Sequence, residues 1–172
     1  EKTKVFDGRR YWRVPVMDGE FFVEETCGVA KGVGGGNVVI QGISLEAALA
    51  SAKRAVSAIA AVPGVITPFP GGVVRSGSKV GSRYAALKAS SNDAFCPSLL
   101  GRVPTQLHPD VVACLEIVID GESEQVICEA MAAAIQAAAG EGIPAISAGN
   151  YGGKLGKFQF YLHQILTDAG LA

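Results

Sequence analysis

The sequence predicts an α+β sandwich in which two long helices cover one face of a mostly antiparallel sheet. Apolar residues recur at helical spacing over 45–62 and 124–139, and short strand-like runs lie around these two segments. Hydrophobic residues make up 49% of the chain and charged residues 18%, which is typical of compact globular proteins. The 172 residues are therefore predicted to form a single domain, 1–172, with a core of its own.

The chain opens with a predicted β-hairpin. Apolar runs at 11–17 and 20–25 flank Asp18-Gly19, and Asp-Gly between two such runs is a strong hairpin signal. Pro15 has no N–H to donate to a neighbouring strand, so the first run is expected at a sheet edge. Another short strand is predicted at 38–41.

The first long helix is predicted over 45–62. Ser44 is a good N-cap residue, and Pro63-Gly64 ends the helical pattern. The stretch 65–109 holds many turn-forming residues apart from short strand pieces such as 65–67. A loop-rich stretch of this length in a compact domain is more often functional than not.

The second half of the chain has a regular pattern. A strand is predicted at 112–119, a helix at 124–139, a strand at 143–147 and a last strand at 157–165. This ending is that of half a ferredoxin-like unit. The predicted fold is therefore a ferredoxin-like two-layer sandwich.

Composition excludes several classes of partner. The net charge of −1 argues against nucleic acid, because nucleic-acid-binding domains usually carry a basic surplus. The sequence holds no run of 18 apolar residues that could span a membrane. The cysteines form no Cys-x-x-Cys pair and only two histidines are present, so a zinc site is not expected. The cysteines are interpreted as reduced thiols of a cytoplasmic protein. They are Cys27, Cys96, Cys114 and Cys128.

Three glycine-rich segments stand out, at 32–37, 69–81 and 149–157. Glycine lets a bound group approach the main chain closely, and the lysines in the last two segments could meet an anion. The segments therefore predict a surface for a large, polar, anionic ligand, with tight turns between strands as an alternative of equal weight. Gly149–Lys154 is one residue short of a Walker A loop, and 32–37 lacks a third glycine in place, which disfavours ATP and NAD.

Glu116 is the one charged residue in the apolar run Ala113–Ile119. Strand alternation places it on the same face as Cys114 and Val118. A lone strand glutamate usually faces solvent, but two apolar neighbours indicate a covered face. A partly desolvated carboxyl there would suit acid/base chemistry. Spacing alone leaves both interpretations open.

Several longer motifs resemble formylmethanofuran:tetrahydromethanopterin formyltransferases. They are the segments 65–82 and 32–37 together with Ser91-Asn-Asp-Ala-Phe-Cys-Pro97, Leu115-Glu-Ile-Val-Ile-Asp-Gly121 and Ala148-Gly-Asn-Tyr-Gly-Gly-Lys-Leu-Gly156. The resemblance covers nearly the whole chain. It corresponds to the family's C-terminal, proximal lobe, so residues 1–172 are expected to be one lobe of a longer two-lobe polypeptide whose N-terminal lobe is absent here.

The resemblance implies an acyltransferase of one-carbon metabolism. It would move a formyl group between formylmethanofuran and N5 of tetrahydromethanopterin, with Glu116 as general acid/base. Methanofuran and tetrahydromethanopterin would be coenzyme substrates, without a metal or a tightly bound cofactor. The substrate-binding residues that the resemblance implies are Gly35, Gly36, Asn37, Ser78, Lys79, Asn92, Asn150, Tyr151 and Lys154.

The resemblance also implies partners. These are the protein's own N-terminal lobe and either further copies in a homo-oligomer, a tetramer, or the other members of a formyltransferase/hydrolase complex. Neither nucleic acid nor a membrane is expected as a partner. The alternative function is a non-catalytic subunit that binds the formyl carrier within a larger complex, and retention of Glu116 favours the enzyme.

Overall fold

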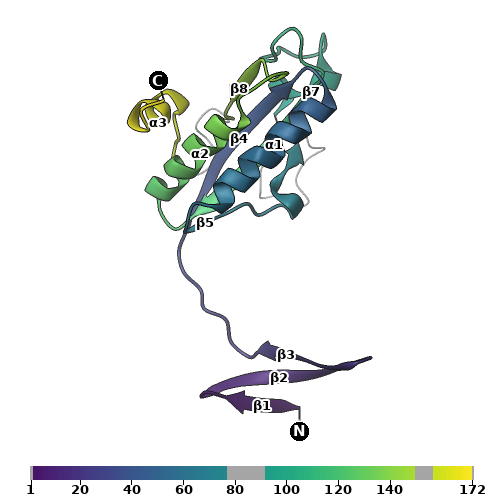
Figure 1. The fold of residues 1–172 in the computed structure, drawn as a ribbon, viewed down its shortest axis with the longest axis vertical. Helices are drawn as coiled ribbons and strands as arrows, with labels where there is room; N and C mark the ends of the chain where they lie inside the picture. Colours follow the sequence, from purple (N-terminus) through teal and green to yellow (C-terminus); the bar gives the residue numbers. More distant parts are fainter. Residues whose placement is uncertain (1, 77–91, 150–156, 172) are drawn as a thin grey trace. The chain divides into compact units, whose positions relative to one another are not determined.

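The computed structural model describes residues 2–76, 92–149 and 157–171, and the chain divides into two compact units, Glu1–Lys31 and Gly32–Ala172. Figure 1 shows both units and labels all of their helices and strands described below except β6. No described helix is long and apolar enough to cross a membrane. The expectation of a single domain that forms one lobe of a longer polypeptide stays a prediction.

The first unit is a three-stranded antiparallel sheet of β1 (Thr3–Phe6), β2 (Arg9–Val16) and β3 (Gly19–Glu24), in that order. The predicted hairpin is confirmed, because Val16 pairs with Gly19 across the turn. The edge position expected for the strand with Pro15 is wrong, since β2 is the central strand. Pro15 is nevertheless tolerated, because β1 pairs with β2 only as far as Trp12, and beyond it Pro15 is paired with β3 alone.

The two faces of this sheet differ in chemistry. One face carries ion pairs of Glu20 with Lys4 and Arg13, and the Lys4 ammonium lies 5.3 Å from the centre of the Phe22 ring. The other face carries Arg10, which forms an ion pair with Glu25, and is otherwise mainly apolar. Its six large apolar side chains, each between 44% and 63% exposed, are Val5, Trp12, Val14, Val16, Phe21 and Val23.

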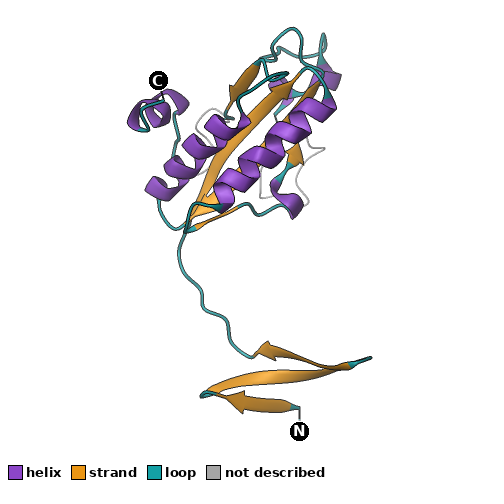
Figure 2. Cartoon of the chain, in the orientation of Figure 1, coloured by secondary structure: helices purple, strands orange, loops and turns teal. Residues whose placement is uncertain are grey.

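The second unit has a five-stranded sheet with two long helices on one face (Figures 1 and 2). The strands are β4 (Val33–Gly42), β5 (Val65–Ile66), β6 (Val74–Arg75), β7 (Ala113–Gly121) and β8 (Ala145–Ser147). The helices are α1 (Leu45–Ala60), α2 (Glu124–Ala138) and the shorter α3 (Leu162–Asp168).

The topology confirms the predicted fold. The sheet order is β5-β7-β4-β8, with β6 also paired to β7, and every pairing is antiparallel. Together with α1 after β4 and α2 after β7, this is the β-α-β-β-α-β arrangement of a ferredoxin-like sandwich. Serine side chains cap both long helices, since Ser44 Oγ accepts from Ala47 N at 3.1 Å and Ser123 Oγ from Val126 N at 3.4 Å.

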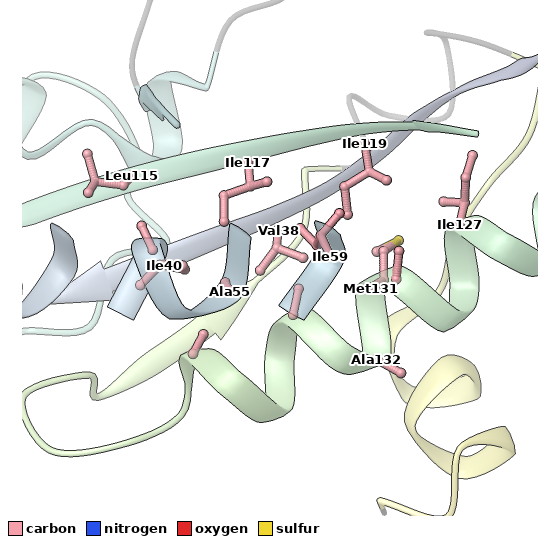
Figure 3. Packing of buried hydrophobic residues seen from close by; sticks show 14 of the residues in the cluster. Val38, Ile40, Ala55, Ile59, Leu115, Ile117, Ile119, Ile127, Met131 and Ala132 are labelled. Carbon is pink, nitrogen blue, oxygen red and sulfur yellow. The ribbon is translucent and has the colours of Figure 1, made fainter. Parts of the chain in front are cut away.

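The main core lies between this sheet and the two long helices, as Figure 3 shows. Alternate residues of β4 and β7 point toward the helices, and the helices present mostly alanine to the sheet and to each other. Alanine on both surfaces lets the two layers approach closely. The core residues include Val38, Ile40, Leu115, Ile117 and Ile119 from the strands and Ala48, Ala52, Ala55, Ile59, Ile127, Met131 and Ala134 from the helices.

The last predicted strand, 157–165, is wrong, because Leu162–Asp168 forms helix α3. Burial does alternate over 157–161, which is why the segment resembles a strand in sequence, but among the described residues it pairs with no other strand. Ile165 is buried in the main core and Leu162 packs against it. Helical spacing of these two residues directs both toward the core, so tertiary packing decides the helix.

The opposite face of the sheet is covered too. The segment between residues 92 and 112 lies over it and contains two short 3-10 turns, Asp93–Phe95 and Pro97–Leu99. A second apolar cluster forms there from Val39, Phe95, Leu107, Val111 and Cys114. Because Cys114 shares its face of β7 with Glu116, this cluster confirms the covered face expected for that glutamate.

Candidate functional site

Glu116 occupies the middle of the sheet. On β7 it lies opposite Val39 of β4 on one side and Val74 of β6 on the other. It is only 8% exposed, and its side chain lies on the face that is covered by residues 92–112. A carboxyl group in this position needs polar partners, because an isolated buried carboxylate is costly.

Two asparagine side chains supply such partners. Asn37 Nδ2 donates to Glu116 Oε1 at 3.2 Å, and Asn92 Nδ2 donates to Glu116 Oε2 at 2.9 Å. Both asparagines are buried, and they reach the carboxyl group from different segments, β4 and the start of the covering segment. Each carboxyl oxygen therefore has an amide donor of its own. This arrangement fixes the direction in which the carboxyl group points.

Asn37 also binds the main chain of Gly149. Gly149 N donates to Asn37 Oδ1 at 2.9 Å, and Asn37 Nδ2 donates to Gly149 O at 3.2 Å. Strand β8 ends at Ser147, which pairs with Val39 of β4, and the same register places Gly149 opposite Asn37. Beyond the end of the β4–β8 pairing, the side-chain amide of Asn37 thus satisfies the N–H and the C=O of Gly149 in place of a main-chain partner.

Gln41 makes a related connection two register positions beyond Val39 on β4. Its Nε2 donates to Ser147 Oγ at 3.3 Å, and its Oε1 accepts from His108 N at 2.8 Å. Gln41 is almost fully buried on the same face as Asn37. The two amides connect β4 to the end of β8 and to the covering segment.

Cys114 and Ser76 complete the described part of this region. Burial raises the pKa of the Cys114 thiol to about 11, and the nearby Glu116 carboxylate also raises it. The hydroxyl of Ser76 lies beside the thiol and partly offsets that rise, although it forms no ordinary hydrogen bond with the described residues. The thiol is thus protonated at neutral pH, which argues against a nucleophilic role for it.

The structure brings together three of the residues that the sequence assigned to the site: Asn37, Asn92 and Glu116. Gly35 forms a bulge in β4, where the register with β7 shifts between Gly34 and Gly36. The roles assigned to all these residues stay predictions. Gly36 is also described, and it lies on the core side of β4. The five remaining assigned residues lie outside the described part of the chain: Ser78, Lys79, Asn150, Tyr151 and Lys154.

Two glycines of the glycine-rich segments have a packing explanation. A Cβ on Gly36 would lie 2.5 Å from Ile127 Cγ2 of α2, on the core side of the sheet. A Cβ on Gly72 would lie 2.8 Å from a methyl group of Val56 of α1, and Gly72 has a φ of +75°. At these two positions glycine is required for close approach of a helix, in line with the structural alternative to a ligand-binding role.

Sequence reasoning missed Gln41, Ser76 and the main chain of Gly149 as parts of this region. A signal for Gln41 was present, because Asn37, Val39 and Gln41 alternate along β4 and so share one face. Ser76 and Gly149 are recognised only through contacts that are distant in sequence. Among residues 2–76, 92–149 and 157–171, no group of three His, Cys, Asp or Glu side chains could hold a metal ion.

Chemically, the region presents one carboxyl group, directed by two amides, on a largely water-excluded face. Asn37 and Asn92 are both neutral donors, so they orient the carboxyl group without adding a charge to it. General acid/base chemistry requires a carboxyl group whose direction is fixed in this way.

Comparison with known proteins gives a consistent result. The family model described as "FTR, proximal lobe" matches residues 19–165. A formylmethanofuran–tetrahydromethanopterin formyltransferase of Methylococcus capsulatus is 56% identical over 169 residues, which cover 96% of this chain and 57% of that relative. The one from Methylobacillus flagellatus is 57% identical over 96% of this chain and 56% of its own length. The chain thus spans little more than half the length of these relatives.

Solved structures agree. The structure of formylmethanofuran:tetrahydromethanopterin formyltransferase from Methanosarcina barkeri has a TM-score of 0.75 and 49% identity, and the match covers 95% of this chain and 56% of that one. The formyltransferase/hydrolase complex of Methylorubrum extorquens, solved with methylofuran, has a TM-score of 0.73 and 48% identity over 92% of this chain and 53% of that chain. The chain belongs to the FTR proximal-lobe family.

Proposed function

We propose that the complete protein transfers a formyl group between formylmethanofuran and N5 of tetrahydromethanopterin, with Glu116 as the general acid/base. The observation that carries this proposal is the buried carboxyl group of Glu116, held by Asn37 at one oxygen and Asn92 at the other. The activity is also the one named for relatives that are 56% and 57% identical to this chain.

The reaction requires the transfer of one proton from N5 of the pterin to the nitrogen of methanofuran. N5 of the pterin attacks the formamide carbon, so a carbon–nitrogen bond forms and N5 must lose its proton. The tetrahedral intermediate then collapses, the bond to the methanofuran nitrogen breaks, and that nitrogen must gain a proton to leave as an amine. Glu116 takes the first proton and donates the second, so the carboxylate is regenerated at the end of each turnover.

The surroundings of Glu116 support a substrate site there. Ser76 immediately precedes residues 77–91, and Asn92 immediately follows them, and both lie on the face of Glu116. Gly149, which Asn37 holds, immediately precedes Asn150. We propose that Ser78, Lys79, Asn150, Tyr151 and Lys154 bind the two coenzymes, with the lysines meeting their anionic groups.

The partners are proposed on the same grounds. A relative from Methylorubrum extorquens that is 49% identical over 163 residues is named as one component of a formyltransferase/hydrolase complex. We propose that this lobe works together with the N-terminal lobe of its own polypeptide, in a homotetramer or in such a complex. Methanofuran and tetrahydromethanopterin are then substrates that bind and dissociate in each turnover, and no cofactor is tightly bound.

The proposal is tested by mixing the complete, purified polypeptide with formylmethanofuran and tetrahydromethanopterin and measuring the formyl-pterin that forms. Transfer that requires both coenzymes, and that runs in reverse from formyl-pterin and methanofuran, is expected. Saturable binding of formylmethanofuran without any transfer would instead support the non-catalytic protein that only binds the formyl carrier.

A further inference from the structure

We infer that Asn37 is a positioning residue for Glu116 and that the main chain of Gly149 sets the orientation of its amide. This inference rests on the proposed function, in which Glu116 carries the proton. It assigns Asn37 a role that differs from substrate binding, and it follows from the way its side-chain atoms are used.

The amide of Asn37 has only one orientation that fits its neighbours. Its Oδ1 accepts the N–H of Gly149 at 2.9 Å, so the amide nitrogen must be the atom that faces both Gly149 O and Glu116. With oxygen and nitrogen exchanged, Asn37 Oδ1 would face two other acceptor oxygens, Glu116 Oε1 and Gly149 O, and the Gly149 N–H would meet an N–H. The main chain of Gly149 therefore decides that Glu116 meets a donor.

Both hydrogens of that nitrogen are already committed. One is donated to Glu116 Oε1 and the other to Gly149 O, each at 3.2 Å. An asparagine amide has two N–H donors, so Asn37 has none left for a substrate. Its side chain is also buried. The contacts of Asn37 are thus inside the protein, which is what a positioning role requires.

The geometry of the sheet explains why an asparagine on β4 reaches Glu116. Val39 lies directly opposite Glu116, and Asn37 is two residues from Val39 on the same face, so Asn37 is a diagonal neighbour of the glutamate. Diagonal neighbours on an antiparallel pair are separated by about 7–8 Å at Cα, which two side chains can bridge together. The Gly35 bulge shortly before Asn37 sets its register.

Loss of the Asn37 donor should remove one of the two amide bonds that direct the carboxyl group, while the bond from Asn92 remains. The expected consequence is a misdirected carboxyl group, not an absent one. We therefore expect a decrease in kcat of roughly 10- to 100-fold, which is below the full range of about 10²–10⁴ for an acid/base residue. The KM values for both coenzymes should change little, because Asn37 does not contact them.

The test is a double-mutant cycle in the complete polypeptide with Asn37→Asp and Glu116→Gln. Asn37→Asp keeps the size of the side chain and its acceptor for the Gly149 N–H, but it places a carboxylate against Glu116. In the double variant the donor and acceptor are exchanged, since the amide of Gln at position 116 can donate to Asp at position 37. Asn37→Asp should therefore lower the thermal midpoint of unfolding, and adding Glu116→Gln should reverse part of that decrease.

Activity gives the second readout of the same cycle. If Asn37 acts through Glu116, then Asn37→Asp should lower kcat by less than about threefold when Glu116 is already Gln. The matched control is Gln41→Glu, which makes the same amide-to-carboxylate change on the same face of β4. The side chain of Gln41 bonds to Ser147 and to the main chain of His108 instead of to Glu116. Its effects on kcat and on the thermal midpoint should add to those of Glu116→Gln.

The outcomes separate this inference from the proposed function. Full additivity of Asn37→Asp and Glu116→Gln, in both kcat and the thermal midpoint, would overturn the positioning role while leaving the proposed function intact. Unchanged turnover in Glu116→Gln alone would remove the proposed acid/base, and the thermal midpoints would still test the contact. If Asn37→Asp does not fold but the double variant with Glu116→Gln does, that rescue supports the inference. If neither variant folds, the same double-mutant cycle is measured with Asn37→Ser in place of Asn37→Asp, and additivity in that cycle would overturn the inference.

Discussion

Gly36 of β4 and Ile127 of α2 are in such close contact that a Cβ on the glycine would lie 2.5 Å from Ile127 Cγ2. Other atoms around that position belong to the Ile119 side chain and main chain, both 3.3 Å away. The side of Gly36 that a Cβ would occupy is therefore filled by the core. This contact fixes the distance between helix α2 and the strand that carries Asn37.

Gly36→Ala should destabilise the protein by about 1–3 kcal/mol, because the added methyl group overpacks the core beneath α2. Chemical denaturation of the purified chain measures the change in the free energy of unfolding. The control is Gly28→Ala, since a Cβ there meets no atom within 4 Å and Gly28 has no positive φ. Equal stability of the two variants would show that α2 does not pack against β4 as described.

Cys114 should react much more slowly with iodoacetamide than Cys27. Burial raises the pKa of the Cys114 thiol to about 11, so at pH 8 only about one molecule in a thousand carries the reactive thiolate. Cys27 is exposed. Mass spectrometry of peptides after timed labelling gives both rates. The Cys114 rate should rise as the pH approaches 11, and labelling of Cys114 as fast as Cys27 at pH 8 would contradict its buried position.

Local signals in the sequence identified much of the fold. Asp18-Gly19 marked the hairpin, and Ser44 and Ser123 stand where the two long helices begin. These features depend on residues a few positions apart, which is why they can be read without a structure. The covered face of Glu116 was likewise indicated by its neighbour Cys114 on the same strand.

Other features depend on contacts that the sequence does not display. Alternation of Phe158, Phe160 and Leu162 favoured a strand, but packing of Ile165 into the core selects a helix. Gly149 meets Asn37 across 112 positions of sequence, so its part in the site could not be anticipated from spacing. The same holds for Ser76, because its place beside Cys114 depends on the pairing of β6 with β7.

A peptide of residues 1–31 should be unfolded on its own. The apolar face of its sheet is largely exposed, and three short strands without a covered apolar face are marginally stable in water. Trp12 is the single tryptophan of the chain, so its fluorescence reports on this unit. The emission of the peptide should match that of the urea-denatured peptide. A cooperative change in emission upon denaturation would show that the unit folds independently.

The isolated 172-residue chain should show little formyl transfer, below about one hundredth of the turnover of the complete polypeptide. Binding energy from parts of a substrate far from the reacting atoms is used to orient those atoms, and this chain covers only 57% of the length of its Methylococcus relative. The assay compares both proteins at saturating coenzyme concentrations. Full turnover by the isolated chain would show that the proximal lobe suffices.

The central claim is that Glu116 carries the proton during formyl transfer. The measurement is the kcat of Glu116→Gln in the complete polypeptide, with Glu129→Gln as the matched control because Glu129 is an exposed glutamate on α2. We predict that Glu116→Gln folds and lowers kcat by about 10²-fold or more, while Glu129→Gln leaves kcat unchanged. The thermal midpoint of Glu116→Gln should be lowered, because one of the two asparagine donors then meets an N–H instead of an oxygen. Near-normal turnover in a folded Glu116→Gln variant would contradict the claim.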